Sequence, residues 1–273
     1  METRLRELSR IIASGNAMLF TGAGFSANAC DLDGNCLPDS ARMCQELWPI
    51  CFPDGEPDGS SLQDLYDVAL LHAADRLRTY VDRRLRVGDA PLPAHIAAWL
   101  GAPWKRIYTL NVDDLEVAVQ RQYKLPRRLH SISALASEPA PSAGDAGDAI
   151  DVIHLNGMAG ARASELTFST MQYAARLCAR DREYERLVSD LEHAPFVFAG
   201  TTLDEAILWQ HFELHRRRKQ LAPLDHPPDH PPAFLISSSL TRARRMLLES
   251  LRIEWVQSTI AEVADQVLSK PAG

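Results

Sequence analysis

The sequence predicts an α/β fold in which a parallel sheet of about six strands carries helices on both faces and a helical insertion. Short apolar segments alternate with segments of helical periodicity along the 273 residues, and this alternation is typical of a buried parallel sheet. Several of the apolar segments end in a glycine turn or in small polar residues. About eighty residues separate the first two predicted strands, far more than a strand-helix-strand crossover needs. This excess predicts the insertion.

The first helix and the first strand are indicated by the spacing of apolar residues. Apolar residues recur at helical intervals over 5–12, and a Gly-Asn turn at 15–16 ends this helix. The short apolar run 17–20 then predicts a strand that leads into a glycine turn.

The insertion is predicted at about 27–104. Residues 31–60 are rich in Asp, Gly and Pro and hold no long period, so they predict an irregular loop. Apolar positions over 62–85 keep to helical intervals and predict one long helix. Together with part of 158–193, the insertion is expected to cap the sheet of a single domain that spans 1–273.

The second half of the chain continues the alternation. A strand over 106–110 leads into a helix over 113–123. This order predicts a sheet built from successive strand-helix-strand units. The further strands are predicted at 150–155, 195–199, 233–237 and 253–257, and the further helices at 170–191, 203–218, 240–251 and 259–268.

The net charge, the amino terminus and the length of the apolar runs argue against nucleic-acid and membrane partners. The formal net charge is −7 and the pI is about 5.7, whereas domains that bind nucleic acid usually carry a basic face. The amino terminus lacks the apolar stretch of a signal peptide, and no run approaches the length of a membrane span. We therefore expect a cytoplasmic protein with no direct nucleic-acid partner and no membrane partner.

The cysteines predict neither a disulfide framework nor a structural zinc site. Their number is odd, and no two of them have the Cys-x-x-Cys spacing of a zinc ribbon. No metal is therefore expected. The five cysteines are Cys30, Cys36, Cys44, Cys51 and Cys178.

A glycine turn follows the first predicted strand. Glycines let the backbone approach a diphosphate closely, and the helix that follows offers free N–H groups and the positive end of its dipole. The motif lacks the third glycine of the full dinucleotide fingerprint, so a tight strand-to-helix turn explains it equally well. The residues of this candidate phosphate loop are Thr21, Gly22, Ala23, Gly24, Phe25 and Ser26.

Polar residues also follow three later strands. Asn111 and Asp113 stand at the end of the second strand, where ligands bind in open parallel sheets. His154 ends the next strand, and histidine can act as a general base near neutral pH. Structural explanations stay open, because Asp113 can cap a helix and a histidine at a strand end can be purely structural. The other candidates at these strand ends are Asn156, Gly157, Gly200, Thr201, Thr202 and Leu203.

Taken in order, these motifs resemble the sirtuin family. The resemblance extends from about residue 14 to 268 and implies a Rossmann-like domain that binds NAD. The segments that carry it are 22–26, 109–113, 154–157 and 200–203, with 166–169 followed by Tyr173.

This sequence differs from the motifs of the deacylase sirtuins in two features. Deacylase sirtuins carry four zinc-binding cysteines after the histidine motif, whereas this interval holds only Cys178. Their catalytic histidine directly precedes a glycine, whereas here Asn156 precedes Gly157 and His154 lies two residues earlier. Positions two apart on a strand share a face, so His154 could still point into the pocket from one step further back. It could equally be a supporting residue behind the site, with Asn156 lining the site. Without the zinc module, the chain resembles the bacterial sirtuin-like NAD hydrolases of antiphage defence.

This resemblance implies an NAD glycohydrolase that cleaves NAD, its substrate, into nicotinamide and ADP-ribose and depletes the cell of NAD. It implies three catalytic residues: Asn111 at the ribose and the attacking water, His154 as the base, and Asp113 at the nicotinamide side. The two glycine turns would hold the diphosphate and the adenosine. A homo-oligomer, or a complex with a sensor or NTPase protein of the same defence system, is also implied.

Other functions stay open at this point. An NAD-dependent protein deacylase or an ADP-ribosyltransferase would have the same fold. Asn156, in place of the family's histidine, also permits a catalytically inactive nucleotide-sensing module. A hydride-transferring dehydrogenase fits less well, because the first turn lacks its third glycine and no acidic residue ends a second strand about twenty residues on.

Overall fold

The computed structural model describes residues 2–136, 149–178, 181–203, 208–209, 213, 217 and 231–268. They build a seven-stranded sheet of order β3-β4-β2-β1-β5-β6-β7 in which all neighbouring strands run parallel. The predicted α/β class, a Rossmann-like parallel sheet with helices on both faces, is confirmed. The strands are β1 (Met18–Thr21), β2 (Arg106–Thr109), β3 (Arg128–Ser133), β4 (Ala149–His154), β5 (Phe196–Ala199), β6 (Ala233–Ser237) and β7 (Ile253–Gln257).

The strand that the sequence pattern misses is β3, which forms one edge of the sheet. Only Leu129 and Ile132 of its residues are buried. An edge strand has one neighbour and a partly solvated surface, so it does not need the continuous apolar run of a central strand. The sheet therefore has one strand more than its apolar segments indicate.

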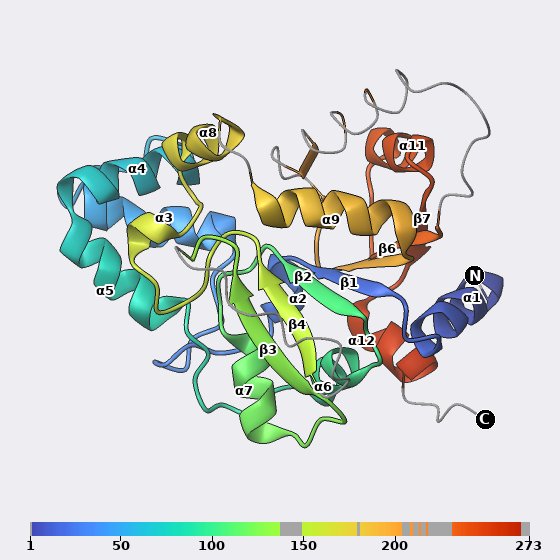
Figure 1. Cartoon of the computed structure of the whole chain (residues 1–273). Helices are drawn as coiled ribbons and strands as arrows, with labels where there is room; N and C mark the ends of the chain where they lie inside the picture. The colour runs from blue at the N-terminus through green and yellow to red at the C-terminus, as the bar shows by residue number, and fades with distance from the viewer. Residues whose placement is uncertain are drawn as a thin grey trace.

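Helices cover both faces of the sheet, as Figure 1 shows. Two apolar cores result, because successive side chains of a strand point to opposite faces. Leu19 of β1 lies in the first core and Phe20 lies in the second. The first face carries α1 (Glu2–Ala13), α6 (Ala94–Gly101), α7 (Leu115–Gln122) and α12 (Ile260–Val263), and the second carries α9 (Arg182–His193) and α11 (Arg242–Ser250).

Three helices of the insertion form a separate group at one end of the molecule, beside α8 (Thr170–Cys178) (Figure 1). They enclose a third apolar core, which Val112 and Leu166 join from outside the group. We propose that 27–104, with part of 158–193, form a capping subdomain on a single domain over 1–273. The third core supports this for α3 to α5, whereas α6 packs on the first face of the sheet. The three helices are α3 (Ser40–Cys51), α4 (Leu62–His72) and α5 (Ala74–Arg84).

The structure corrects several of the predicted element bounds. The expected loop over 31–60 contains α3, which begins where the Asp39 side chain accepts a hydrogen bond from Arg42 N at 2.8 Å. The single helix expected over 62–85 is broken at Ala73, which leaves helical geometry at φ −144°. The helix expected over 170–191 is likewise divided into α8 and α9. Most of the helix predicted at 203–218 lies outside the described residues.

The order of the strands creates a crevice beside β1. The chain builds β2, β3 and β4 on one side of β1 and then crosses to add β5 on its other side. In open parallel sheets, ligands bind at the carboxyl ends of the strands where the direction of winding reverses. We therefore expect a ligand site at the turns that follow β1 and its neighbours.

Candidate active site

A cavity of about 630 Å³ opens at the carboxyl ends of the strands. Its floor is formed by residues that follow or end β1, β2, β4, β5, β6 and β7, and its roof comes from the capping helices. Residues from both the sheet and the insertion thus enclose one space. The predicted site residues on its wall are Gly22, Ala23, Gly24, Ser26, Asn111, Asp113, Asn156, Gly200, Thr201 and Thr202.

Other predicted site residues lie close to the cavity but not on its wall. Phe25 points into the first core and meets Trp99 edge-on, with ring centroids 6.4 Å apart. Gly157 packs against Glu165 O, and an added Cβ would approach that oxygen to 2.6 Å. Thr21 and Leu203 are buried beside the turns that do reach the cavity. These residues support the wall from behind, and His154, described below, does the same.

The two glycine turns pack against each other. Gly24 N donates a hydrogen bond to Gly200 O at 2.9 Å, and a Cβ on Gly22 would meet Thr201 Cβ at 2.8 Å. Gly200 has φ +66°, and a Cβ there would meet Phe25 N at 2.2 Å. Glycine is thus required by turn-to-turn packing. The helix that follows the first turn, α2 (Ala23–Ser26), is a single turn, so a long helix dipole contributes little there.

Asn111 is oriented by both hydrogens of its amide group. Its Nδ2 donates to Gly22 O at 3.0 Å and to Ser26 Oγ at 2.5 Å. The carbonyl oxygen of Gly22 can only accept, so the atom facing it must be the amide nitrogen. The other amide atom, Oδ1, has no hydrogen-bond partner among the residues that the structure describes. Asn111 therefore presents an acceptor, and no amide hydrogen, to a molecule in the cavity.

Ser26 links Asn111 to the carboxylate of Asp113. Ser26 Oγ donates to Asp113 Oδ2 at 2.7 Å, and Leu115 N donates to Asp113 Oδ1 at 3.2 Å. The N-cap residue of α7 is Asp114, so Asp113 contacts the first turn of this helix without being its N-cap. Burial raises the pKa of Asp113 to about 6, and the nearby Glu116 adds to this effect, whereas the Ser26 hydroxyl opposes it. The carboxyl group of Asp113 is thus on the wall and titrates close to neutral pH.

His154 lies behind this cluster, with a side chain that is 1% exposed. Its Nδ1 is 2.9 Å from Asn111 O and its Nε2 is 3.1 Å from Glu116 Oε1. Both partners are acceptors, so both ring nitrogens donate and the imidazole is protonated. Burial alone lowers the pKa of His154, but the Glu116 carboxylate raises it above its usual value.

Glu116 completes this buried pair. Its Oε1 also accepts a hydrogen bond from the Ser131 hydroxyl of β3. Burial raises the pKa of Glu116, but the His154 charge outweighs this effect and holds the pKa below its usual value. The pair of Glu116 and His154 is therefore ionic. Through His154 Nδ1 it holds the main-chain oxygen of Asn111 from the side away from the cavity. Nothing in the sequence singles out Glu116, because an acidic residue in the first turn of a helix is common.

Of the two arrangements that the sequence leaves open, the structure has the second: Asn156 lines the cavity and His154 lies behind it. Strand β4 ends at His154, so the two-residue alternation of a strand does not extend to Asn156. His154 turns toward α7, whereas Asn156 Oδ1 accepts from Arg176 Nη1 of α8 at 3.4 Å. Asn156 Nδ2 donates to Leu110 O at 3.1 Å. Asn156 thus reaches the cavity wall and His154 does not.

Two parts of the wall were not predicted from the sequence. A hydroxyl-rich part follows β6 and β7, because short polar residues end these strands as they end the others. An apolar part comes from the cap and from the segment before α8. The signal for the first was present in the strand-end pattern, whereas the second depends on how the insertion folds over the sheet. These residues are Ser237, Ser238, Ser258 and Thr259 in the first part, and Leu37, Met43, Leu62, Leu85 and Phe168 in the second.

The described part of the chain holds no candidate metal site and no candidate membrane span. No group of three or more His, Cys, Asp or Glu side chains there is arranged to hold a metal ion. No helix among those residues combines the length and the apolar character that a membrane crossing requires.

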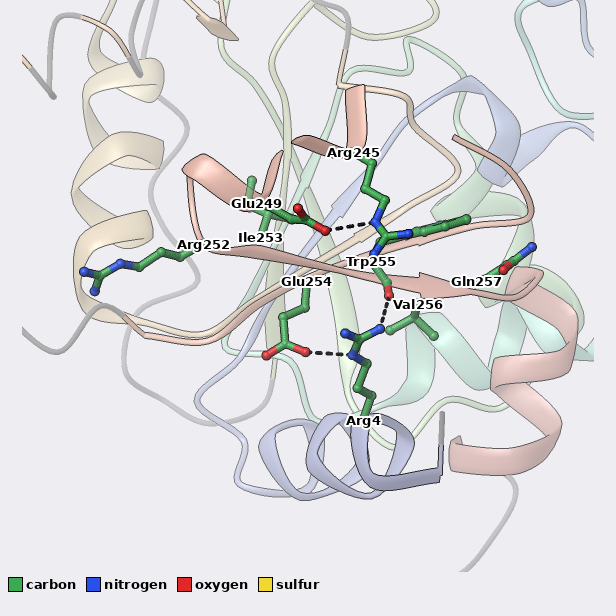
Figure 2. A pocket seen from close by; sticks show the side chains of 9 residues that line it. All are labelled: Arg4, Arg245, Glu249, Arg252, Ile253, Glu254, Trp255, Val256 and Gln257. Carbon is green, nitrogen blue, oxygen red and sulfur yellow. Dashed lines mark hydrogen bonds and ion pairs between the residues drawn. The ribbon is translucent and has the colours of Figure 1, made fainter. Parts of the chain in front are cut away.

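A second hollow, of about 410 Å³, lies at the opposite edge of the sheet beside β7. Figure 2 shows that Arg4 contacts Glu254 and that Arg245 contacts Glu249 in this hollow. None of the predicted site residues lines it. No residue of β1, β2 or β5 lines the hollow either, so the larger cavity is the candidate active site.

No family model and no curated protein matches the chain. Among solved structures, the chain is similar to a mutant of a Sir2 homologue in complex with ADP-ribose, at 18% sequence identity and a TM-score of 0.41. The match covers 96% of this chain and 94% of that chain. The fold class itself rests on the parallel sheet and on the helices that cover it.

Proposed function

We propose that the protein is an NAD glycohydrolase that breaks the bond between nicotinamide and ribose. The observation that carries the proposal is the cluster of Asn111, Ser26 and Asp113 on the wall of the cavity. It joins an oriented acceptor to a buried carboxyl group at the strand ends where dinucleotides bind. The cavity is also large enough for a ligand of this class, since ligand pockets commonly measure about 300–1,000 Å³.

The two ends of the cavity suit the two halves of NAD. Thr201 and Thr202, with the hydroxyl groups after β6 and β7, offer partners for the diphosphate and the adenosine ribose. Met43 and Phe168, which also line the cavity, supply an apolar wall for the nicotinamide ring. NAD is a substrate in this proposal, and no metal takes part.

Cleavage begins with the departure of nicotinamide. The electron pair of the C1′–N bond goes to the nicotinamide nitrogen, and positive charge builds up on the ribose. The carboxylate of Asp113 stabilises this charge, because electrostatic attraction is stronger where bulk water is excluded. The oxygen of a water molecule, held by Asn111 Oδ1, then bonds to C1′ and gives a proton to Asp113. A pKa of about 6 suits this role as a general base at neutral pH.

The geometry changes the role proposed for His154. Both of its ring nitrogens donate hydrogen bonds to protein acceptors, so neither has a free electron pair to take a proton. We propose instead that His154, held by Glu116, positions Asn111 through its main-chain oxygen. Asp113 takes the role of base.

Replacement of Asn111 tests the site directly. Asn111→Ala is expected to lower nicotinamide release from NAD by at least about 100-fold, since it removes the acceptor for the water. The matched control is Asn16→Ala, the same change at an exposed residue before the opposite end of β1. The measurement is chromatography of NAD, nicotinamide and ADP-ribose in a reaction that contains NAD alone. Cleavage that survives in Asn111→Ala would exclude this site.

A nucleotide-sensing module is the second candidate, and Asn156 is the observation that favours it. Its amide is neutral and is bonded to Leu110 O and Arg176, so it supplies no proton where the family has its histidine. Calorimetry that shows tight binding of NAD without release of nicotinamide would support this function. Deacylases and ADP-ribosyltransferases require an acceptor, so cleavage of NAD alone separates the hydrolase from both.

The cellular role follows from the resemblance of the motifs. We propose a cytoplasmic antiphage effector that depletes NAD after infection. In this role the protein would act as a homo-oligomer or in a complex with a sensor or NTPase protein of the same defence system. Loss of cellular NAD on phage infection, in cells that carry the wild type and not Asn111→Ala, is the expected result.

A further inference from the structure

Cys30 and Cys36 face each other across a small hairpin between the glycine turn and the cap. The two residues form an antiparallel bridge, with Asp31 N donating to Asn35 O at 2.7 Å and Leu37 N to Ala29 O at 2.9 Å. These hydrogen bonds flank the cysteine pair and do not join its two members. Cys30 and Cys36 are thus a non-hydrogen-bonded pair, the type in which side chains approach most closely.

This arrangement meets the geometric requirement for a disulfide. The Cα atoms of a non-hydrogen-bonded pair lie about 4.5 Å apart, and disulfides join Cα atoms that are about 4.4–6.8 Å apart. Both thiols are free, Cys36 is exposed and Cys30 is partly exposed. The two thiols can therefore react with an oxidant from solvent and then with each other without a large movement of the backbone.

The turn of the hairpin is held rigidly by Asp31. Its Oδ1 accepts hydrogen bonds from the main-chain N–H groups of Asp33 and Asn35, each at 2.9 Å. Gly34 takes φ +83°, and its N–H donates to Asp31 O at 3.1 Å, which closes the turn. The cysteines are thus held in register before any bond forms between them.

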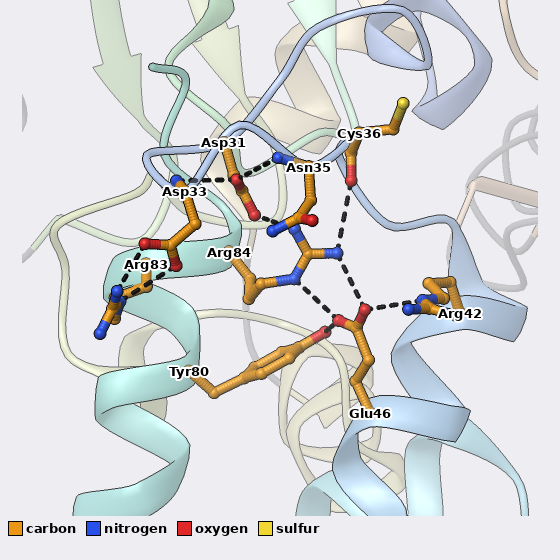
Figure 3. A network of polar contacts seen from close by, with 9 residues as sticks. All are labelled: Asp31, Asp33, Asn35, Cys36, Arg42, Glu46, Tyr80, Arg83 and Arg84. Carbon is orange, nitrogen blue, oxygen red and sulfur yellow. Dashed lines mark hydrogen bonds and ion pairs between the residues drawn. The ribbon is translucent and has the colours of Figure 1, made fainter.

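Arg84 clamps this hairpin to the capping helices, as Figure 3 shows. Its guanidinium pairs with Asp31, donates to Cys36 O at 3.3 Å and reaches Glu46 Oε2 of α3 at 2.9 Å. The carboxylates of the hairpin are occupied by arginines, since Arg83 pairs with Asp33 in the same way. In Figure 3 the thiol of Cys36 points away from this network. The sulfur therefore stays accessible while its backbone is held.

The other described cysteines are less suited to react. Cys44 and Cys51 both lie on α3, and burial raises the pKa of each thiol, so less thiolate forms at neutral pH. Cys51 Sγ also donates to Leu65 O at 3.3 Å. No opposed pair of the Cys30 and Cys36 kind is present among them.

We propose that Cys30 and Cys36 are an oxidation site that a hydroperoxide converts to a reversible disulfide. Cys36 attacks hydrogen peroxide, which forms an S–O bond, breaks the O–O bond and releases water. Cys30 then attacks the sulfenic sulfur, which forms the S–S bond and releases a second water. Two thiols are oxidised and one peroxide is reduced to two water molecules. A thiol reductant restores both cysteines.

The disulfide would cross-link the hairpin that adjoins one wall of the cavity. Leu37 and Pro38 follow Cys36 directly and line the cavity, and Ala29 lies three residues after Ser26. The oxidation site is defined by its own chemistry, so its test does not depend on whether the cavity cleaves NAD.

Peptide mass spectrometry of the folded 273-residue chain tests the proposal. The reduced protein is treated with hydrogen peroxide, its remaining thiols are alkylated, and it is digested with trypsin. Cys30 and Cys36 share the fragment 11–42, whereas Cys44 and Cys51 share 43–76. Fragment 11–42 is expected to be unalkylated and two hydrogen atoms lighter than its reduced form, with 43–76 fully alkylated. Treatment with dithiothreitol before alkylation should reverse the change.

Two variants and one condition complete the experiment. Cys36→Ser is expected to leave Cys30 alkylatable, and the matched control Cys51→Ser is expected to form the disulfide as the wild type does. Because the folded chain holds the pair in register, Cys30 should trap the sulfenic acid before a second peroxide molecule reacts with it. At high peroxide concentration, the ratio of disulfide to sulfinic acid in fragment 11–42 should therefore be at least about tenfold higher for the folded chain than for the urea-unfolded chain. An equal ratio in the two states, a sulfinic acid at Cys36 as the main product of the folded chain, or pairing with another cysteine would each overturn the proposal.

Discussion

Asp113 shows how burial alone can give an ordinary residue a reactive character. A carboxyl group that has lost its hydration holds its proton to higher pH, and its pKa rises to about 6. The free energy of unfolding therefore gains a contribution from Asp113 at low pH, and this contribution is lost as the pH rises from about 4 to about 6. Above about pH 6 the carboxyl group of Asp113 is ionised. It can then act as a base, but its buried charge lowers the free energy of unfolding.

Asp113→Asn is predicted to separate these two effects. The change removes a buried charge, so the free energy of unfolding at pH 7.5 is expected to rise by roughly 1–2 kcal/mol after the loss of one hydrogen bond is included. Nicotinamide release is expected to fall by at least about 100-fold. Urea denaturation at pH 4.5 and pH 7.5 and the NAD cleavage assay measure both quantities. A variant that is less stable than the wild type at pH 7.5, or one that retains activity, would contradict this role.

The pH dependence of the wild-type enzyme should carry the same signature. Because the base must be ionised, kcat/KM is expected to fall as the pH drops through about 6. The assay is repeated from pH 5 to pH 8 at constant ionic strength. A profile without an acid limb in this range would assign the base to another group.

The buried pair of Glu116 and His154 should behave as a single unit. His154 stabilises the fold below its unfolded pKa, about 6.5, and this stabilisation is lost as the pH rises through its raised folded value. The Glu116 contribution is present above its unfolded pKa, about 4.3, and is lost as the pH falls through its lowered folded value. The pair of Glu116 and His154 therefore makes its full contribution to the free energy of unfolding between about pH 4.3 and about pH 6.5.

Glu116→Gln and His154→Gln are each predicted to lower the free energy of unfolding at pH 6 by about 3–5 kcal/mol, since each leaves a buried charge unpaired. The double variant should lose less than the sum of the two single losses, because it removes both charges. Urea denaturation of the four proteins measures this coupling. Additive losses would show that the two side chains do not interact.

At the scale of elements, the two glycine turns act as one unit. Gly200→Ala would force a Cβ into Phe25 N at a residue with φ +66°. Gly160 is the matched control, because it has φ +89° but nothing within 4 Å of an added Cβ. Both variants carry the conformational penalty of about 1–2 kcal/mol for a left-handed residue, and Gly200→Ala should lose at least about 2 kcal/mol more. Equal thermal stability of the two variants would show that the turns do not pack as described.

The helices and strands also differ in how clearly the sequence predicts them. Central strands β1 and β5 were predicted from continuous apolar runs, because a strand that is buried on both sides is largely apolar. Edge strand β3 was not, because half of it is solvated. Helix α3 was hidden within a segment rich in Asp, Gly and Pro, and it forms because its apolar side chains Met43 and Leu47 pack on α4 and α5. Tertiary contacts there outweigh local propensity.

At the scale of the whole molecule, the cavity is closed only when the sheet and the cap are both folded. A ligand that contacts both should therefore raise the melting temperature by binding only the native state. ADP-ribose, the proposed product, is expected to raise Tm by about 5 °C at 100 times its Kd. Differential scanning fluorimetry of the wild type and of Asn111→Ala measures the shift. An unchanged wild-type Tm at millimolar ADP-ribose would argue against the proposed ligand.

The sequence by itself determined the parallel sheet and the positions of its polar strand ends, because burial and backbone conformation are written locally in apolar runs and glycine turns. It therefore located Gly22, Asn111, Asp113 and Gly200 near one another. Only the tertiary structure decided that Asn156 reaches the cavity while His154 turns away to a buried carboxylate on α7. The direction of a side chain after a strand ends, and the partner that it meets there, depend on elements far away in the chain.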